Sequence, residues 1–307
     1  MSSHDPSSPG RGISQPDPSQ LRVETQHSLE PGLYIVSTPI GNLRDITLRA
    51  LDILTSADEI LAEDTRKTRR LLDAYGLKSR VTPYHDHNGA ERRPDILKKL
   101  QDGGRLALVS DAGTPLLSDP GYKLVRAVLD EGHKVIPIPG ASALLAGLVS
   151  AGLPSDRFLF AGFPPQKTVA RQGAFKDLAA IDATLIFYES PRRLAASLSE
   201  MAKAFGNDRD VVVARELTKL FEETRTGTLF ELAEHYEEAG PPKGEVVILV
   251  GPPLGVGEVS QADIETALLA AMKELPLKKA AAEVSEELGL SKRDLYQLGL
   301  TLKDRLE

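Results

Sequence analysis

The sequence predicts an α/β protein with two α/β domains and a helical extension at the carboxyl end. Short apolar runs alternate with segments of helical periodicity along most of the chain, and turn clusters separate them. Of the 307 residues 41% are hydrophobic, so the chain can bury more than one core. We expect a leader at 1–30, domains at 31–150 and 151–255, and a helical tail at 256–307.

The first predicted domain alternates strands with helices, a pattern typical of a mainly parallel sheet. Each predicted strand is an apolar run, and turn or capping residues separate it from the next helix; Gly76, for example, ends the second helix. We expect strands at 33–37, 59–62, near 81, from 106 and at 134–137. The intervening helices are expected at 46–54, up to 75, at 94–101, at 122–131 and after 139–142.

A hinge is predicted at 150–156, where Gly152 and Pro154 interrupt the pattern. The second α/β domain follows, because apolar runs predict strands at 157–161, 184–188, 210–214 and 245–250. Beyond Gly255 the composition favours helices. The leader contains Ser, Pro, Gly and charged residues with few large apolar groups, so we expect it to be disordered.

Composition excludes several classes of protein. The chain has no cysteine, which rules out disulfides and thiolate metal sites. No apolar run is long enough for a membrane span and no hydrophobic signal core is present, so we expect a cytoplasmic protein. The net charge of −7 argues against a surface coated with nucleic-acid contacts, yet residues 64–80 are locally basic. This stretch sets six cations against two acids: Arg66, Lys67, Arg69, Arg70, Lys78 and Arg80 against Asp64 and Asp73.

Residues 106–121 read as a buried strand that delivers a ligand loop at its carboxyl end, where open α/β sheets bind small molecules. The loop carries Asp111 and Asp119, and residues 106–122 contain no lysine. A phosphate cradle requires Gly amides with Lys or Arg, and these carboxylates would repel a phosphate. The loop therefore favours a ligand that presents hydroxyls, an amine or a positive centre.

Several motifs resemble those of one enzyme family. Residues 37–42 (STPIGN), 46–50 (ITLRA), 113–115 (GTP) and 139–143 (PGASA) are similar to loops of the tetrapyrrole methylases. Within that superfamily the chain resembles the methyltransferases of small-subunit ribosomal RNA through residues 63–66, 85–88, 110–115, 187–193 and 215–219. The similarity spans roughly residues 33–250, and a helical tail is also expected of this group.

The resemblance implies an S-adenosylmethionine-dependent enzyme that methylates a cytidine 2′-hydroxyl in the decoding region of 16S rRNA. It also implies a homodimer with the cofactor between the two domains. We expect no metal site. Two departures argue against a tetrapyrrole substrate. The first loop keeps only Gly41 where tetrapyrrole enzymes have several glycines, and Thr114 replaces the aspartate of their Gly-Asp-Pro motif.

Small residues at strand ends permit a close approach of the backbone to a cofactor. The alternative is that Gly and Pro simply form turns, but the set as a whole favours a ligand site. The predicted cofactor contacts are Pro39, Ile40, Gly41, Ala112, Gly113, Thr114, Leu117, Ser142, Ala143, Tyr188 and Glu189.

Methyl transfer to a hydroxyl benefits from a nearby base. Asp64, Asp111, Glu189 and His85 are the candidates, and we favour Asp64 because its loop carries the pattern specific to the RNA enzymes, with Glu189 second. The alternative for Asp64 is a helix cap, a role that the same residue can combine with catalysis.

The predicted RNA contacts are basic or hydrogen-bonding side chains near these loops. Alternatively, the basic helical face is merely solvated, and Lys219 pairs with Glu216 or Glu222. His85 and His87 are metal ligands by type, but they have no clear third partner. The set comprises Arg66, Arg69, Arg70, His85, His87, Asn88, Arg192, Arg193 and Lys219.

Residues 278–302 have a helix-turn-helix layout, which three-helix packing units share, so we expect an accessory RNA-docking or packing module. Two other functions compete with the leading one. The first is methylation of a porphyrin or corrin on the same scaffold. The second is a non-catalytic RNA-binding assembly factor that retains the cofactor loops.

Overall fold

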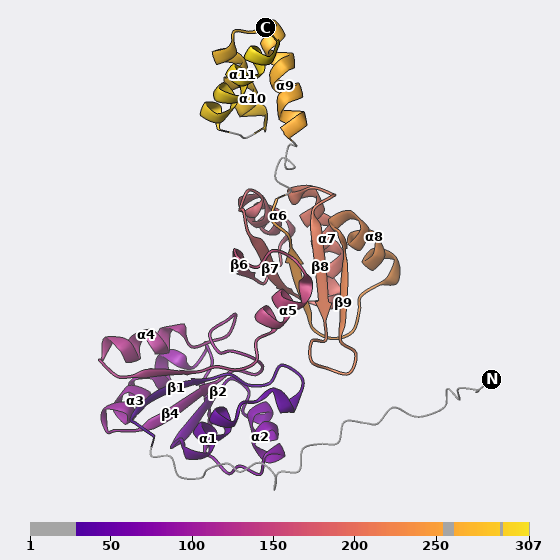
Figure 1. The fold of residues 1–307 in the computed structure, drawn as a ribbon. Helices are drawn as coiled ribbons and strands as arrows, with labels where there is room; N and C mark the ends of the chain where they lie inside the picture. The colour runs from indigo at the N-terminus through magenta and orange to yellow at the C-terminus, as the bar shows by residue number, and fades with distance from the viewer. Residues whose placement is uncertain (1–28, 254–260, 289–290, 307) are drawn as a thin grey trace, which may run out of the picture.

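The computed structural model of the chain describes residues 29–253, 261–288 and 291–306 (Figure 1). They form two five-stranded sheets with flanking helices and a group of three helices near the carboxyl end. The predicted fold class is therefore confirmed. The predicted disordered leader lies almost entirely outside the described residues. No helix in the described ranges is long and apolar enough to cross a membrane.

The first sheet is wholly parallel, as predicted, with the strand order β3-β2-β4-β1-β5. The carboxyl ends of all five strands therefore lie at the same edge of the sheet, which is where such sheets bind ligands. The strands are β1 (Gly32–Val36), β2 (Glu59–Ala62), β3 (Val81–Pro83), β4 (Arg105–Val109) and β5 (Val135–Ile138). The helices are α1 (Leu48–Ser56), α2 (Thr65–Ala74), α3 (Gly89–Gln101), α4 (Tyr122–Asp130) and α5 (Ala143–Ala151).

The second sheet has the order β6-β7-β10-β8-β9, in which only β6 and β7 pair in parallel. Its strands are β6 (Phe158–Gly162), β7 (Thr184–Glu189), β8 (Asp210–Arg215), β9 (Glu223–Thr228) and β10 (Val246–Val250). The helices are α6 (Thr168–Leu178), α7 (Leu194–Phe205) and α8 (Leu229–Ala239). The sequence did not predict β9, because this half-exposed edge strand contains no large apolar residue.

Helix α5 links the two sheets. Leu144 and Leu148 on this helix share a core cluster with Ile186 and Val212 of the second sheet, although our division assigns the helix to the first domain. The boundary at 150/151 stays a prediction. The shared core fixes the loops of the first sheet against the second sheet.

The carboxyl-terminal helices are α9 (Gln261–Glu274), α10 (Leu277–Leu288) and α11 (Lys292–Leu306). They form a small core of their own, in which Leu268, Ala281 and Leu295 are buried. Figure 1 shows these helices apart from the two sheets.

Candidate functional site

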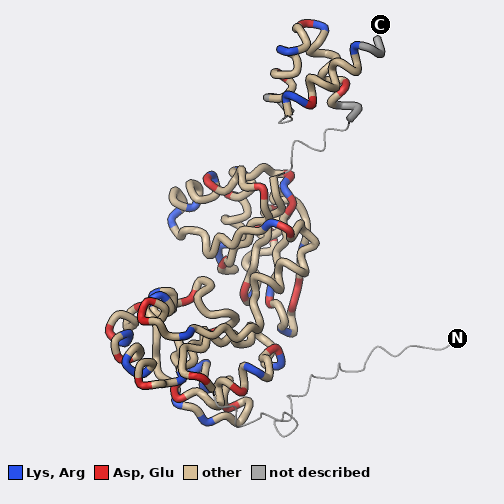
Figure 2. Tube along the Cα trace, turned by 60° about the vertical axis from the view of Figure 1, so that its left-hand side comes forward, with Lys and Arg blue, Asp and Glu red and all other residues tan. Residues whose placement is uncertain are grey.

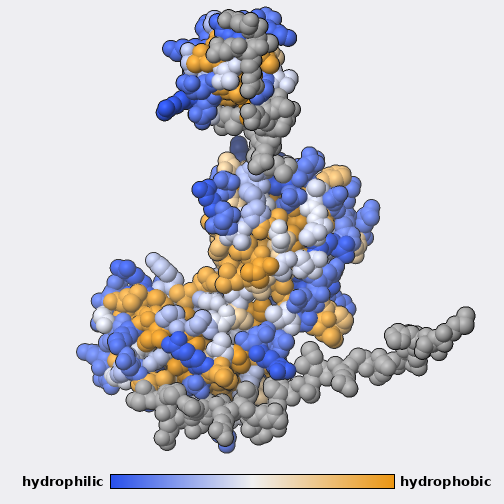
Figure 3. Space-filling model, viewed as in Figure 1, coloured by the Kyte–Doolittle hydropathy of each residue, from blue (hydrophilic) through white to orange (hydrophobic). Residues whose placement is uncertain are grey.

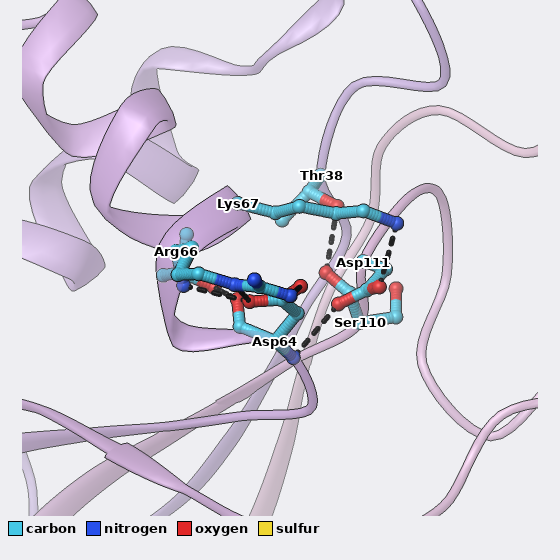
Figure 4. Close-up of polar contacts among 7 residues, drawn as sticks. Thr38, Asp64, Arg66, Lys67, Ser110 and Asp111 are labelled. Atoms are coloured by element: carbon cyan, nitrogen blue, oxygen red, sulfur yellow. Dashed lines mark hydrogen bonds and ion pairs between the residues drawn. The ribbon is translucent and has the colours of Figure 1, made fainter.

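The loops that follow β1 and β4 are joined by backbone hydrogen bonds. The N–H of Thr38 donates to the carbonyl of Gly113 at 2.9 Å, and the N–H of Gly113 donates back at 3.0 Å. The Thr38 hydroxyl also donates to the Ser110 carbonyl (Figure 4). Gly113 has a φ of 81°, and a Cβ there would lie 3.2 Å from the Ile40 side chain. This position therefore requires glycine for both conformation and space.

Thr114 connects three loops. Its hydroxyl donates to the carbonyl of Ala141 at 3.2 Å and lies 3.1 Å from the hydroxyl oxygen of Ser37. Thr114 stands where the tetrapyrrole enzymes have aspartate. Here a neutral hydroxyl fixes the loops and adds no charge to the site.

A cavity of about 410 Å³ lies between the two domains, a size suited to a small-molecule ligand. All of the predicted cofactor residues line it except Pro39 and Gly41. Two residues in the loop after β4, Leu116 and Ser118, have φ values of 74° and 61°, and such left-handed residues with a Cβ mark strained, often functional loops. The lining residues are Ile40, Lys67, Asp111, Ala112, Gly113, Thr114, Leu117, Ser118, Asp119, Ser142, Ala143, Phe163, Tyr188, Glu189, Ser190, Pro191, Leu217, Gly244, Glu245, Val246 and Val247.

A second cavity of about 350 Å³ adjoins the first. It takes Pro39 and Gly41 from the set of predicted cofactor residues, and Arg70 and Lys219 from the set of predicted RNA contacts. The two cavities share a wall, which consists of Ile40, Lys67, Asp111, Ala112 and Glu245.

An ion pair lies in this shared wall. Lys67 Nζ is 2.7 Å from Asp111 Oδ2, while Asp111 Oδ1 accepts the backbone N–H of Asp64 at 2.9 Å (Figure 4). The hydrogen bond to Asp111 raises the pKa of Lys67, which therefore remains a cation at neutral pH.

The first cavity carries an excess of negative charge. Burial and the neighbouring carboxylates of Glu63 and Asp111 raise the pKa of Asp119 to about 6. Burial and Asp111 also raise the pKa of Glu63. Lys67 is the one cation among the described residues that line this cavity. A positively charged ligand would relieve this repulsion.

The two predicted bases are both engaged elsewhere. Asp64 caps α2 by accepting the N–H of Arg66 at 2.9 Å and pairs with the Arg66 side chain, which holds the pKa of Asp64 far below its ordinary value. Asp64 lines neither cavity. The Glu189 carboxylate is buried and accepts hydrogen bonds from the N–H of Ser190 at 2.7 Å and the hydroxyl of Ser197 at 2.5 Å. A catalytic role for either residue stays a prediction.

The basic face of α2 is exposed. Arg66, Arg69 and Arg70 are all exposed, while Leu71 and Leu72 pack inward as their spacing predicts. Only Arg70 of the three lines the second cavity. Figure 2 shows basic and acidic positions interspersed over the molecule, so any attraction of a polyanion is local to this face.

The segment 85–88 forms the turn before α3. The side chain of Asn88 accepts the N–H of His85 at 2.9 Å and donates to the carbonyl of Pro83 at 3.1 Å. The His85 and His87 rings lie 6.0 Å apart, edge to face. No group of three possible metal ligands occurs among the described residues.

The other predicted RNA contacts differ in whether their charge is already paired within the protein. Arg192 is exposed, whereas Arg193 forms an ion pair with Glu189 at 2.6 Å. Lys219 binds Glu216 at 2.7 Å and Glu245 at 2.9 Å, so the pairing partly expected for it is present. Its aliphatic stem covers the Gly41 backbone so closely that a Cβ at this glycine would clash with it.

The family is decided by comparison with known sequences. The sequence model of the Tetrapyrrole (Corrin/Porphyrin) Methylases matches residues 32–233. The chain belongs to this family. A second model, the RsmI C-terminal HTH domain, matches residues 258–303 and thus the three helices α9 to α11.

Curated relatives of this tetrapyrrole methylase carry a more specific name. Ribosomal RNA small subunit methyltransferase I of Mesorhizobium japonicum is 54% identical over 276 residues, which cover 90% of this chain and 94% of that protein. The protein of the same name from Escherichia coli O157:H7 is 48% identical and covers 87% of this chain and 94% of its own length. The branch that the motifs predict is confirmed.

Solved structures of tetrapyrrole methylases and their relatives share the fold. A cobalt precorrin-4 methyltransferase has a TM-score of 0.55 at 21% identity, covering 78% of this chain and 98% of its own. A diphthine synthase has a TM-score of 0.56 at 18% identity, covering 71% and 89%. At these identities the likeness concerns the fold alone.

Sequence reasoning missed several lining residues of this methylase. The sequence places Lys67 only in a basic stretch, and it places Asp119 in the ligand loop without assigning it to the site residues. The start of β10, with Glu245 and Val246, was read as an ordinary strand. A signal for Lys67 was available, since it follows the α2 cap by three positions and directly follows the motif at residues 63–66, but its partner Asp111 is remote in sequence.

Proposed function

We propose that this protein transfers a methyl group from S-adenosylmethionine to the ribose 2′-hydroxyl of a cytidine in the decoding region of 16S rRNA. One observation carries the proposal: two cavities of ligand size meet at a wall that holds the Lys67–Asp111 pair. A transferase needs a donor site and an acceptor site in contact. The relatives named ribosomal RNA small subunit methyltransferase I support RNA as the acceptor.

The first cavity suits the donor. S-adenosylmethionine supplies an electrophilic methyl group on a positively charged sulfur, and its amine is also cationic. The carboxylates of Asp111 and Asp119 favour such a ligand, while Leu117 and Val247 provide apolar surface for a purine ring. The hydroxyl of Tyr188 accepts the N–H of Leu144 at 3.1 Å, which ties the lining of the second domain to α5 of the first.

The second cavity suits the acceptor. Lys67, Arg70 and Lys219 line it and can attract the phosphates beside the acceptor ribose. A neutral hydroxyl becomes an effective nucleophile as its proton leaves. Asp111 lies in the shared wall, and each of its oxygens retains a lone pair beyond the hydrogen bond it already accepts. We assign the hydroxyl proton to Asp111, with Lys67 holding that carboxylate in place.

The remaining RNA contacts extend from this centre. Arg66 and Arg69 continue the exposed face of α2, with His85, His87, Asn88, Arg192 and Arg193 as further contacts, and α9 to α11 dock on the small subunit. We place the reaction in the cytoplasm.

The enzyme acts as a homodimer in this proposal. Figure 3 shows apolar surface near the junction of the two sheets. Leu145 and Val149 on α5, Phe158 on β6 and Val169 on α6 are exposed apolar residues that a second copy would cover. Sedimentation of the purified protein measures this state.

The test uses labelled S-adenosylmethionine and small ribosomal subunits from a strain that lacks the enzyme. We expect label in 16S rRNA, at a cytidine whose 3′ phosphodiester bond then resists alkaline cleavage, because a methylated 2′-oxygen can no longer attack that bond. Unlabelled rRNA, from protein that still binds the cofactor, would contradict the proposal. Label transferred to a porphyrin or corrin instead would favour the competing substrate class.

A further inference from the structure

Two exposed apolar side chains form the tip of the loop between β8 and β9. Leu220 is 87% exposed and Phe221 is 68% exposed. They directly follow Lys219, which lines the second cavity and covers Gly41. Figure 1 shows this loop extending from the second sheet toward the first domain. An apolar tip in water is unfavourable unless a ligand covers it.

The backbone below the tip is held in a strained conformation. Glu216 and Thr218 have φ values of 52° and 66°, a left-handed conformation that is unfavourable for residues with a Cβ. Leu217 between them is buried at the domain interface. The Glu216 carboxylate accepts the N–H of Glu245 at 3.0 Å, and the carboxylate of Glu222 accepts that of Thr218. Such strain persists only where surrounding contacts impose it, and it is typical of functional loops.

We propose that Phe221, supported by Leu220, stacks on an unpaired base of the RNA and thereby holds the acceptor nucleotide at the second cavity. The inference rests on the proposed function. Proteins commonly recognise unpaired RNA bases by stacking them on aromatic side chains, with cations on the backbone. The tip supplies the ring, and Lys219 and Arg70 supply the cations. Two side chains offer far less than the roughly 800 Å² per partner of a stable protein interface, which favours a base over a second copy.

The experiment compares Phe221→Ala, Phe221→Trp and Phe230→Ala with the unaltered protein. Phe230 is the matched control, because it is 47% exposed on α8 and lines neither cavity. Binding of unmodified small subunits is measured by cosedimentation, and transfer of label gives kcat and KM. Cofactor affinity and thermal unfolding report on the fold of each variant.

We expect Phe221→Ala to weaken subunit binding and raise KM by roughly tenfold to a hundredfold, with cofactor affinity unchanged. Phe221→Trp should bind at least as tightly as the unaltered protein, since a larger ring stacks better, and Phe230→Ala should have no effect. Equal binding by Phe221→Ala and the unaltered protein would overturn the inference while leaving the methyltransferase proposal intact. Dissociation of a dimer by Phe221→Ala would also overturn it, in favour of an interface between copies. If the unaltered protein transfers no methyl group to RNA, it is the proposed function that fails.

Discussion

The two ends of strand β2 treat negative charge in opposite ways. At the amino end Glu59 has a side chain only 4% exposed, and three cations surround it: Lys99 at 2.7 Å, Arg92 at 3.5 Å and Arg80 at 4.0 Å. Burial alone would raise the pKa of Glu59, but hydrogen bonds from Lys99 and Thr82 keep it below its ordinary value. The charge at this end is neutralised within the protein.

At the carboxyl end the negative charge is compensated only in part. Glu63 follows the strand directly, and burial together with Asp111 raises its pKa. Asp119 has its pKa raised as well, and Lys67 is the cation in contact with Asp111. Charges that serve the fold find partners during folding, whereas a ligand site keeps unfavourable electrostatics that the ligand relieves. The same strand therefore stabilises the sheet at one end and positions a site at the other.

The largest expected effect tests the carboxyl end. Asp111→Asn should lower kcat by about a hundredfold or more, because it removes the carboxylate that takes up the hydroxyl proton. Steady-state transfer of label to small subunits measures kcat, and thermal unfolding is the control for folding, because Asp111 also lines the donor cavity. Asp64→Asn is the matched variant, and we expect it to retain most activity. The reverse pattern would restore Asp64 as the base that the sequence favours.

The next effect concerns the amino end. Glu59→Gln should lower the free energy of unfolding by roughly 2 kcal/mol, less than for a fully buried pair because Lys99 and Arg92 are partly exposed. The folded-state pKa of Glu59 is lowered, so its contribution is present above pH 4.5 and is lost as the pH falls further. Urea unfolding at pH 7 and pH 3 measures this difference. An equal gap between the two proteins at both pH values would contradict the electrostatic explanation.

A smaller effect of opposite sign is expected at Asp119. Its pKa rises from 3.8 to about 6, so the folded protein holds this proton more tightly and loses stability as the pH rises through that window. Asp119→Asn should therefore stabilise the cofactor-free protein at pH 7. The full shift corresponds to about 3 kcal/mol, but solvent screening at this half-buried group leaves about 1 kcal/mol.

The affinity for the cofactor should rise with pH, whereas the stability of the cofactor-free protein falls. The unaltered protein should bind S-adenosylmethionine more weakly below pH 6, as Asp119 becomes neutral. Calorimetric titration between pH 5 and pH 8 should show that Asp119→Asn removes most of this dependence. A variant that is destabilised at pH 7 would show that Asp119 holds the loop in shape instead.

The sequence predicts the fold well where local signals agree. The apolar runs mark the strands of the first sheet, and Thr47 and Asp64 cap helices as their residue types suggest. Proline favours the first turn of a helix, so the sequence predicts that α3 starts at Pro94, whereas the helix begins at Gly89 and contains this proline. The sequence does not predict strand β9, because an edge strand can form without apolar side chains.

The candidate site was predictable only in part. The local composition of the loops that contain Gly113 and Ser142 predicts a ligand site. The junction of the cavities cannot be predicted in this way. Lys67 contacts Asp111, which is 44 residues away in the sequence, and Glu245 belongs to the other domain. The hydrogen bond between the Glu189 carboxylate and the hydroxyl of Ser197 on α7 likewise appears only in the folded chain.

The smallest effect is expected at a second pair on the amino side of the sheet. Asp58, just before β2, pairs with Arg105 at 2.5 Å, but these side chains are 43% and 37% exposed. Asp58→Asn should change the free energy of unfolding by at most about 0.5 kcal/mol, since solvent screens the pair and the amide oxygen can still accept the N–H of Arg105. Urea midpoints of Asp58→Asn and Glu59→Gln, measured together, distinguish the effect of burying an ion pair from the effect of placing two charges close together. If both variants lose the same stability, burial of Glu59 is not what distinguishes the amino end of β2, and the contrast between its two ends would reduce to the number of cations at each.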